Sequence, residues 1–182
     1  MMNWTLRLAR ENDIPAIEKL IPLSVRSLQA AYYSPVQMEA ALGPVFGVDR
    51  QLILDGTYFA ADLKGRIIGC GGWSKRRSLF GGSAGRKADE GQLDPARDPA
   101  RIRAFFVHPD FARQGIGRAI LVACEIAIVS AGFHKAELVA TLAGEPLYAA
   151  SDYVAVERYE INMSGGLGLP AVRMSKQFTK EV

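Results

Sequence analysis

The chain has 182 residues, of which 49% are hydrophobic and 23% charged, and it carries a formal net charge of +3. These values exclude a disordered or fibrous protein and predict one compact domain spanning residues 1–182. Acidic residues lie between the basic ones along most of the chain, and only Lys75–Arg77 is a basic run. We therefore expect no nucleic-acid partner, because phosphate binding usually requires a dense basic face.

The sequence also argues against a membrane protein, a disulfide scaffold and a metal site. The most apolar stretch, Ala119–Phe133, is interrupted by Glu125 and is shorter than the ~20 residues that a membrane helix needs. The N-terminus reaches Arg7 too early for a signal peptide. The two histidines show no metal-ligand spacing with the two cysteines, and Cys70 and Cys124 lie in apolar runs. We expect a cytoplasmic protein with no metal, no membrane partner and both thiols in its core.

The first fifty residues predict a strand followed by two helices. Trp4–Leu8 alternates apolar and polar residues like a short strand. Apolar residues then recur at helical spacing from Ile14, and Pro22 is expected to bend or divide this helix. A second, short helix is expected after Ser34-Pro35, ending at Gly43-Pro44.

A hairpin and a long loop follow. Thr57–Leu63 and Arg66–Ser74 are strand-like and are separated by Lys64-Gly65, a typical turn. The glycines inside the second strand predict a bulge or a close backbone approach there. From Ser78 to Pro99 no apolar period survives, and this loop is either a lid that contacts substrate or simply mobile.

The second half of the chain alternates strands and helices. The most regular helix begins at Gly115 and Gly117 and runs to about Ser130, with apolar residues at three- and four-residue steps. Around it the pattern predicts strands at Ile102–Val107, Lys135–Thr141, Val154–Met163 and Ala171–Phe178, and a short helix at Pro146–Ser151. The mixture predicts an α/β or α+β sheet.

The glycine-rich start of this helix is a candidate phosphate site. A strand, a tight glycine turn and a helix N-terminus present bare backbone N–H groups, and Arg113 and Arg118 flank them. The alternative is a helix start that only packs tightly on the sheet. A Rossmann fingerprint would need a small residue where Ile120 stands, and the Gly-Lys-Ser or Gly-Lys-Thr of a P-loop does not occur.

The stretch Phe105–Leu121, FFVHPDFARQGIGRAIL, resembles the acyl-coenzyme A motif of the GNAT superfamily of N-acetyltransferases. Leu147-Tyr148 and Asp152–Val154 resemble that family's tyrosine helix and the entry to its next strand. The resemblance implies a GNAT-like fold, a mixed and mostly antiparallel sheet flanked by helices. Two positions depart from the family pattern: Ala112 stands where Gln or Arg is frequent, and Asp152 replaces a glycine but tolerates a left-handed turn.

The resemblance also implies a cofactor site and a catalytic residue. Acetyl-coenzyme A would be the cosubstrate, with its pantetheine arm along the backbone of Phe105, Phe106 and Val107. Its pyrophosphate would be held by the turn formed by Arg113, Gln114, Gly115, Ile116, Gly117 and Arg118. Tyr148 would protonate the departing thiolate, since a phenol and a thiol have similar pKa values. The alternative is that Tyr148 only forms part of the wall.

The acceptor implied by the resemblance is a primary amine, on a small molecule or a peptide, that attacks the thioester directly in a ternary complex. The base is open between Glu137, His108 and ordered water. We expect the first helices and the loop Ser78–Pro99 to build the acceptor pocket, and Tyr32, Tyr33 and Trp73 either to line it or to serve as ordinary packing. A non-catalytic acyl-coenzyme A sensor and a nucleotide-binding domain are the rival functions. The sequence leaves the acceptor and the oligomeric state open, a homodimer included.

Overall fold

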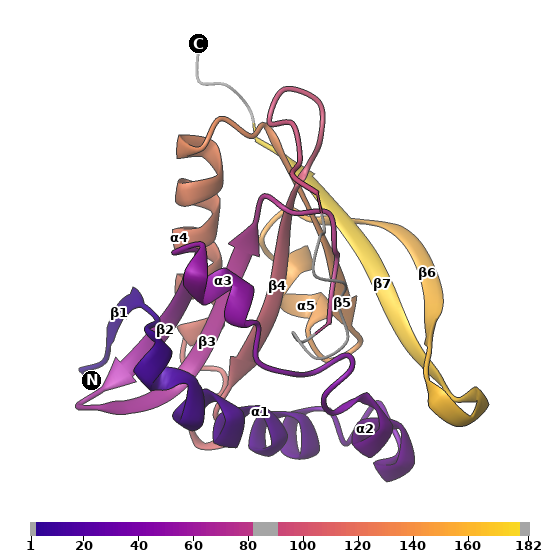
Figure 1. Ribbon diagram of the computed structural model, residues 1–182. Helices are drawn as coiled ribbons and strands as arrows, with labels where there is room; N and C mark the ends of the chain where they lie inside the picture. The colour runs from indigo at the N-terminus through magenta and orange to yellow at the C-terminus, as the bar shows by residue number, and fades with distance from the viewer. Residues whose placement is uncertain (1–2, 82–90, 179–182) are drawn as a thin grey trace.

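The computed structural model describes residues 3–81 and 91–178, which form a seven-stranded sheet in the order β1-β2-β3-β4-β5-β7-β6 (Figure 1). All neighbouring strands are antiparallel except β4 and β5, which are parallel. The predicted mixed, mostly antiparallel sheet is therefore confirmed. The strands are β1 Thr5–Leu8, β2 Tyr58–Leu63, β3 Arg66–Ser74, β4 Ala100–Val107, β5 Lys135–Thr141, β6 Val154–Asn162 and β7 Gly168–Gln177.

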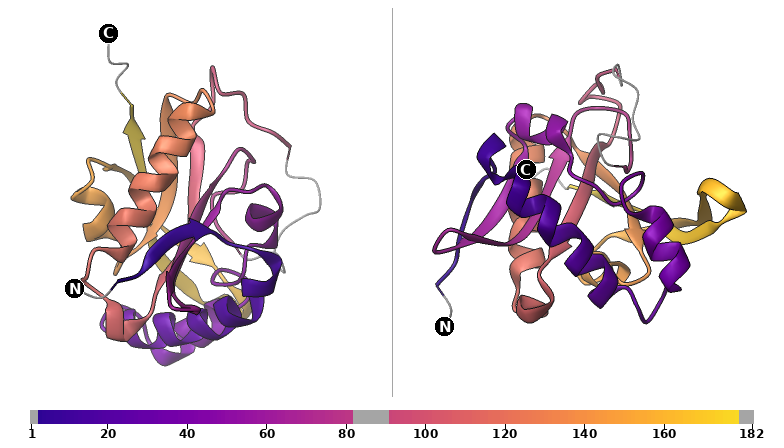
Figure 2. Two further views of the ribbon diagram at one scale, coloured as in Figure 1. Left: turned by 90° about the vertical axis from the view of Figure 1, so that its left-hand side faces the viewer. Right: turned by 60° about the horizontal axis from the view of Figure 1, so that its bottom comes forward.

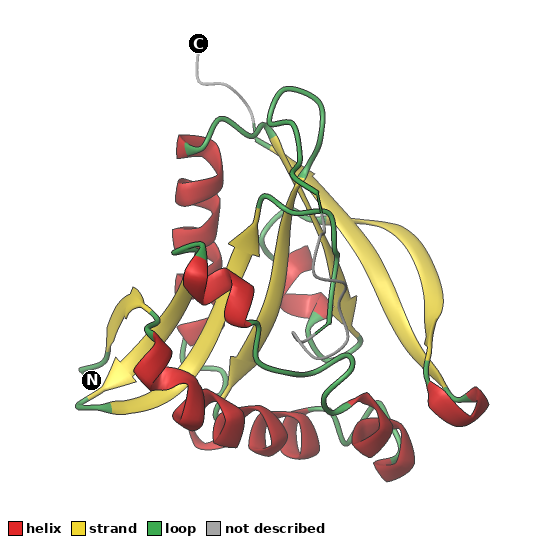
Figure 3. Cartoon of the chain, in the orientation of Figure 1, coloured by secondary structure: helices red, strands yellow, loops and turns green. Residues whose placement is uncertain are grey.

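Helices cover both faces of this sheet (Figures 2 and 3). The helices are α1 Ile14–Leu28, α2 Pro35–Ala41, α3 Arg50–Leu54, α4 Ile116–Ser130 and α5 Glu145–Ala149. Helix α1 packs against β3 and β4 on one face, and α4 packs against β2, β3 and β4 on the other. No helix in the described parts of the chain is long and apolar enough to cross a membrane.

The N-terminal helices differ from the expectation at two points. Of the two effects expected of Pro22, bending or dividing the first helix, division does not occur, because α1 is one element from Ile14 to Leu28. Its buried apolar face includes Ile17 and Ile21, and this packing outweighs the single backbone hydrogen bond that proline removes. Helix α3 was not predicted from the sequence, although Asp49 accepts a capping hydrogen bond from the Leu52 N–H at 3.3 Å.

The hairpin of β2 and β3 is confirmed, and its glycines are close-approach positions. A Cβ at Gly71 would lie 2.5 Å from the Phe105 ring, and one at Gly69 would lie 2.6 Å from Ile116. Only glycine lets β3 pass this close to β4 and α4. The predicted bulge in β3 lies on its other side, where Ile68 is an extra residue against β2; at the register shift between Cys70 and Gly72 the extra residue belongs to β4.

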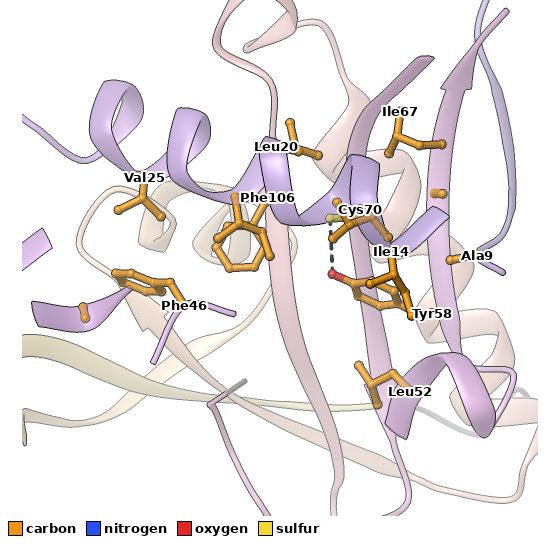
Figure 4. Packing of buried hydrophobic residues seen from close by; sticks show 14 of the residues in the cluster. Ala9, Ile14, Leu20, Val25, Phe46, Leu52, Tyr58, Ile67, Cys70 and Phe106 are labelled. Carbon is orange, nitrogen blue, oxygen red and sulfur yellow. Dashed lines mark hydrogen bonds between the residues drawn. The ribbon is translucent and has the colours of Figure 1, made fainter. Parts of the chain in front are cut away.

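The core beneath α1 contains aromatic rings and one of the two thiols (Figure 4). The Tyr58 hydroxyl lies 3.2 Å from Cys70 Sγ and donates to the Ala104 carbonyl at 2.9 Å. Phe46 meets Phe106 edge to face, with ring centroids 6.2 Å apart. Burial raises the pKa of the Cys70 thiol to about 12 and also raises that of Cys124, so both stay protonated at neutral pH. The two cysteines are core residues, as expected.

Strand β4 contains a bulge that separates it from β5. Ala104 has a left-handed φ of 62°, and Ala104 and Phe105 together oppose the single residue Gly71 of β3. β4 pairs with β5 only through Ala100–Ile102, so the rest of its edge is unpaired on that side. The bulge therefore opens a gap in the middle of the sheet.

Replacing Ala104 by glycine should stabilise the protein. A left-handed non-glycine residue costs about 1–2 kcal/mol, and glycine removes this strain at a smaller entropic cost. We expect Ala104→Gly to raise the free energy of unfolding by about 0.5–1 kcal/mol in urea titrations. The matched variant Ala100→Gly, in the same strand without a positive φ, should lower it. Equal destabilisation by both variants would contradict a strained bulge.

The predicted loop Ser78–Pro99 is partly built into the fold. Its residues 82–90 lie outside the described residues, and the lid stays a prediction. Leu93 is buried and its N–H donates to the Lys75 carbonyl at 2.8 Å, while Arg76 and Gln92 form an isolated bridge. The far end of the loop thus returns to the end of β3.

Candidate functional site

A cavity of about 720 Å³ follows the gap between β4 and β5 through the sheet. On one side it is bounded by the start of α4 and by α5, which we call the α4 arm. On the other side, the α1 arm, it is bounded by α1, the chain at 45–47 and 79–81, and the β6–β7 hairpin. Eight of the nine predicted cofactor-binding residues and Tyr148 line it; Gln114 does not.

The α4 arm ends on a helix start that offers free backbone donors. Gly115 is the N-cap of α4 with φ of 83° and ψ of 0°, and Arg113 before it has φ of 63°. No group in the described chain accepts the N–H groups of residues 115–118. Four such donors and the positive end of the helix dipole favour an anion here, and Arg113 and Arg118 add formal charge.

Gln114 and Ala112 differ in their position relative to the cavity: Ala112 lines it and Gln114 does not. The Gln114 side chain turns back to donate to the Asp110 carbonyl at 3.3 Å. Because Ala112 lines the cavity, a Gln or Arg, which is frequent at this position in the family, would place a polar group there. The left-handed turn expected at Asp152 is confirmed by its φ of 66°.

Strand β4 turns alternate side chains toward the two sheet faces. Phe105 contacts Tyr148 on the α4 side, and Phe106 contacts Phe46 on the α1 side. The Val107 N–H donates to Ser24 Oγ at 3.2 Å, so one backbone donor of the exposed edge already has a partner within the chain. The remaining edge of β4 is a place where an extended ligand can pair like an added strand.

Tyr148 lies in α5 at the wall of the cavity and is only 7% exposed. Its ring meets those of Phe105 and Tyr153 edge to face, with both centroid distances 6.0 Å. Burial raises the pKa of the Tyr148 phenol, so it is protonated at neutral pH. No described residue hydrogen-bonds its hydroxyl, which leaves the proton for a ligand.

Neither base considered from the sequence lines the cavity. Glu137 pairs with Arg101 at 2.7 Å and with Arg173 at 3.6 Å. It lies where β4 and β5 are hydrogen-bonded to each other, and not where the two strands separate around the cavity. His108 Nε2 accepts from the Arg66 guanidinium at 2.8 Å, and its Nδ1 lies 3.2 Å from the Asp110 N–H. Both groups are therefore held in contacts within the fold, away from the cavity wall.

Of the three aromatic residues considered for the acceptor pocket, only Tyr32 lines the cavity. Tyr32 is half-exposed and lines the α1 arm. Tyr33 is core, because its hydroxyl donates to the Pro170 carbonyl at 2.6 Å and accepts from the Leu142 N–H at 3.0 Å. Trp73 packs on Phe133 in the cluster beneath α4.

The sequence reasoning missed several residues of the α1 arm. They include Leu28 and Gln29 of α1 and its C-cap, and Phe46 and Leu169 from two other segments, whereas Phe80 belongs to the loop Ser78–Pro99 that the sequence had suggested. For α1 a signal existed: Ser24 and Leu28 lie four residues apart and share one helix face. For the other segments no local pattern points to the cavity.

The sequence profile of the acetyltransferase (GNAT) family matches residues 24–152, which is more than half of the chain. The chain belongs to this family. The match contains the last turn of α1, the gap in the sheet, the glycine turn and Tyr148, so the family profile covers most of the cavity wall described above. No curated protein sequence matches the chain.

Solved structures agree with this fold. A GCN5-related N-acetyltransferase from Rhodopseudomonas palustris has a TM-score of 0.71 and 22% identity, with 98% of each chain covered. The PaiA N-acetyltransferase of Thermoplasma acidophilum, solved in complex with coenzyme A, has a TM-score of 0.66 and 13% identity, covering 97% of this chain and 100% of its own. YncA of Salmonella typhimurium, a putative acetyltransferase with its cofactor acetyl-CoA, has a TM-score of 0.65 and 16% identity, covering 98% and 96%.

Proposed function

We propose that this GNAT acetyltransferase is a single catalytic domain that moves the acetyl group of acetyl-coenzyme A to a primary amine. The amine attacks the thioester directly while both substrates are bound. One observation carries the proposal: a helix start with free N–H groups, an unpaired strand edge and a buried phenol all line one cavity. No other described part of the chain combines these three features.

The residues at the α4 arm fit the charged part of the cosubstrate. The N–H groups of residues 115–118 would bind the pyrophosphate oxygens, and Arg113 and Arg118 would add charge-assisted contacts. The pantetheine arm would then lie along the edge of β4 that β5 leaves open. This path brings the thioester to the gap between the strands, where Tyr148 lies. The coenzyme complexes of the related PaiA and YncA structures support the choice of ligand.

Tyr148 would act as the general acid. When the amine nitrogen bonds to the thioester carbon and the carbon–sulfur bond breaks, the thiolate gains the proton that the phenol gives up. Burial raises the pKa of this phenol, and the same dry surroundings would raise that of the departing thiol. The two groups therefore stay matched, and the nitrogen's surplus proton leaves to water and restores the phenol.

Two measurements with the purified protein test the proposal. Calorimetry should show binding of acetyl-coenzyme A and of coenzyme A, and an amine panel should release free thiol from acetyl-coenzyme A. Binding without thiol release from any amine would indicate the acyl-coenzyme A sensor instead. If ADP competes with coenzyme A on equal terms, the turn would be that of a nucleotide-binding domain.

A further inference from the structure

Among the residues that the structure describes, the wall of the α1 arm is mainly apolar and holds no carboxylate. Its described wall is formed mainly by Leu28, Tyr32, Phe46, Phe80, Ile161 and Leu169. No Asp, Glu, Lys or His occurs among the described residues that line the whole cavity. A substrate that fills this arm must therefore bring an apolar body.

The charged side chains of the described cavity wall are all cations, so they offer an ammonium group no negative partner. The described wall holds three arginines, two of which belong to the glycine turn. The third, Arg103, is 5% exposed, is paired with Asp49 at 2.9 Å, and donates to Ser74 Oγ at 3.2 Å and to the Ser78 carbonyl. An ammonium ion entering the α1 arm would lose its water without meeting a carboxylate of the described wall, which is strongly unfavourable.

One neutral polar group in this arm lacks a partner. Gln29 follows the last turn of α1, lines the cavity and is only 7% exposed. Its Oε1 has no hydrogen-bond partner among the described residues. A buried oxygen acceptor without a donor is destabilising, and the N–H of an uncharged amine would satisfy it.

We propose, on the basis of the function proposed above, that the acceptor is an amine that is uncharged at neutral pH and is carried on an apolar body, of the arylamine class, and that Gln29 Oε1 receives one of its N–H groups. Such an amine has its lone pair free when it binds. An alkylamine with a pKa near 10.4 is neutral in only about one molecule in 2,500 at pH 7 and would need a base. The described cavity wall provides no such base, because Glu137 and His108 lie elsewhere.

The chemistry balances without a protein base. The amine nitrogen forms a bond to the acetyl carbon, and the carbon–sulfur bond breaks. The nitrogen loses one proton and the sulfur gains one, so R–NH₂ and the thioester become the amide and the free thiol. Gln29 takes no proton in this step; it orients the nitrogen, and so it acts as a specificity residue.

Paired amines with the same ring test the proposal. Thiol release with acetyl-coenzyme A at pH 7 is compared for 4-methylaniline, which is neutral, for 4-methylbenzylamine, which is an ammonium ion, and for spermidine. We expect kcat/KM to be at least tenfold higher for 4-methylaniline than for 4-methylbenzylamine, and no release with spermidine. A preference for either charged amine would overturn the proposal while leaving acetyl transfer itself intact. Absence of release with every amine would instead refute the proposed function.

Variants of Gln29 separate recognition from packing. Gln29→Glu supplies an isosteric carboxylate and should lower kcat/KM for 4-methylaniline about tenfold while raising it for 4-methylbenzylamine. Gln29→Leu should raise KM for 4-methylaniline without a gain for 4-methylbenzylamine. The control Gln177→Glu adds the same charge at an exposed position at the end of β7 and should change neither value. Coenzyme A affinity measured by calorimetry reports correct folding, and unchanged selectivity in a well-folded Gln29→Glu variant would refute the role of Gln29.

Discussion

Tyr148→Phe is expected to lower kcat by about 100-fold while the affinity for coenzyme A stays within a factor of two or so. The change removes one hydroxyl that has no partner among the described residues, and the ring stays against Phe105 and Tyr153. The proton that stabilises the departing thiolate is then missing, whereas the glycine turn is untouched. Thiol-release kinetics and calorimetry on the same preparation measure the two quantities.

Tyr153→Phe is the matched control. Its ring also packs on Tyr148, but it does not line the cavity, so we expect an unchanged kcat. Unchanged turnover in Tyr148→Phe, or equal losses in both variants, would remove Tyr148 from the chemistry.

The pH profile gives an independent check on Tyr148. Burial raises the pKa of this phenol above its ordinary value of about 10, so the protonated form persists at every lower pH. We expect kcat at saturating substrates to show no alkaline decline below about pH 10. A decline centred near pH 8 would show that another group is the acid.

Gly115→Val should abolish most of the binding of coenzyme A. Gly115 has a φ of 83°, where a β-branched residue is strongly disfavoured, although a Cβ would meet open space. The strain of about 1–2 kcal/mol is relieved by turning the peptide away, which withdraws N–H groups from the phosphate position. We expect the affinity measured by calorimetry to fall at least roughly tenfold, which is 1.4 kcal/mol.

Gly165→Val is the control that separates phosphate binding by the glycine turn of α4 from the effect of backbone strain alone. Gly165, in the turn between β6 and β7, has a φ of 73° and also has open space around its Cβ position. Its valine variant should lose a similar amount of stability and retain coenzyme A binding. If both variants weaken binding equally, the glycine turn of α4 has no special role in holding the phosphate.

Local patterns predicted most of the elements correctly. Helix α4 was recognisable because its apolar period and its glycine start lie within one stretch of 16 residues, Gly115–Ser130. The strand at β5 matches its predicted bounds, since its alternation is complete within seven residues. Helix α3 was missed because its five residues are too short to establish a period.

Glu137 and His108 do not line the cavity, for a reason that no local pattern contains. Glu137 follows the motif helix by a few residues, but its direction is set by pairing across β4 and β7, which brings it to Arg101 and Arg173. The contacts of His108 are likewise decided by Arg66, 42 residues away. Gln29 had no catalytic signature and became a candidate only through its burial in the cavity wall.

The sequence by itself determined the family, the order of the elements, the glycine turn with its flanking arginines, and Tyr148 as the residue to test. These features are written in contiguous stretches, where the spacing of residues controls backbone conformation directly. Only the tertiary structure decided that a strained Ala104 opens the sheet between β4 and β5, that both expected bases point elsewhere, and that the α1 arm is apolar. Each of these depends on contacts between segments far apart in the chain, and such contacts exist only once the sheet has formed.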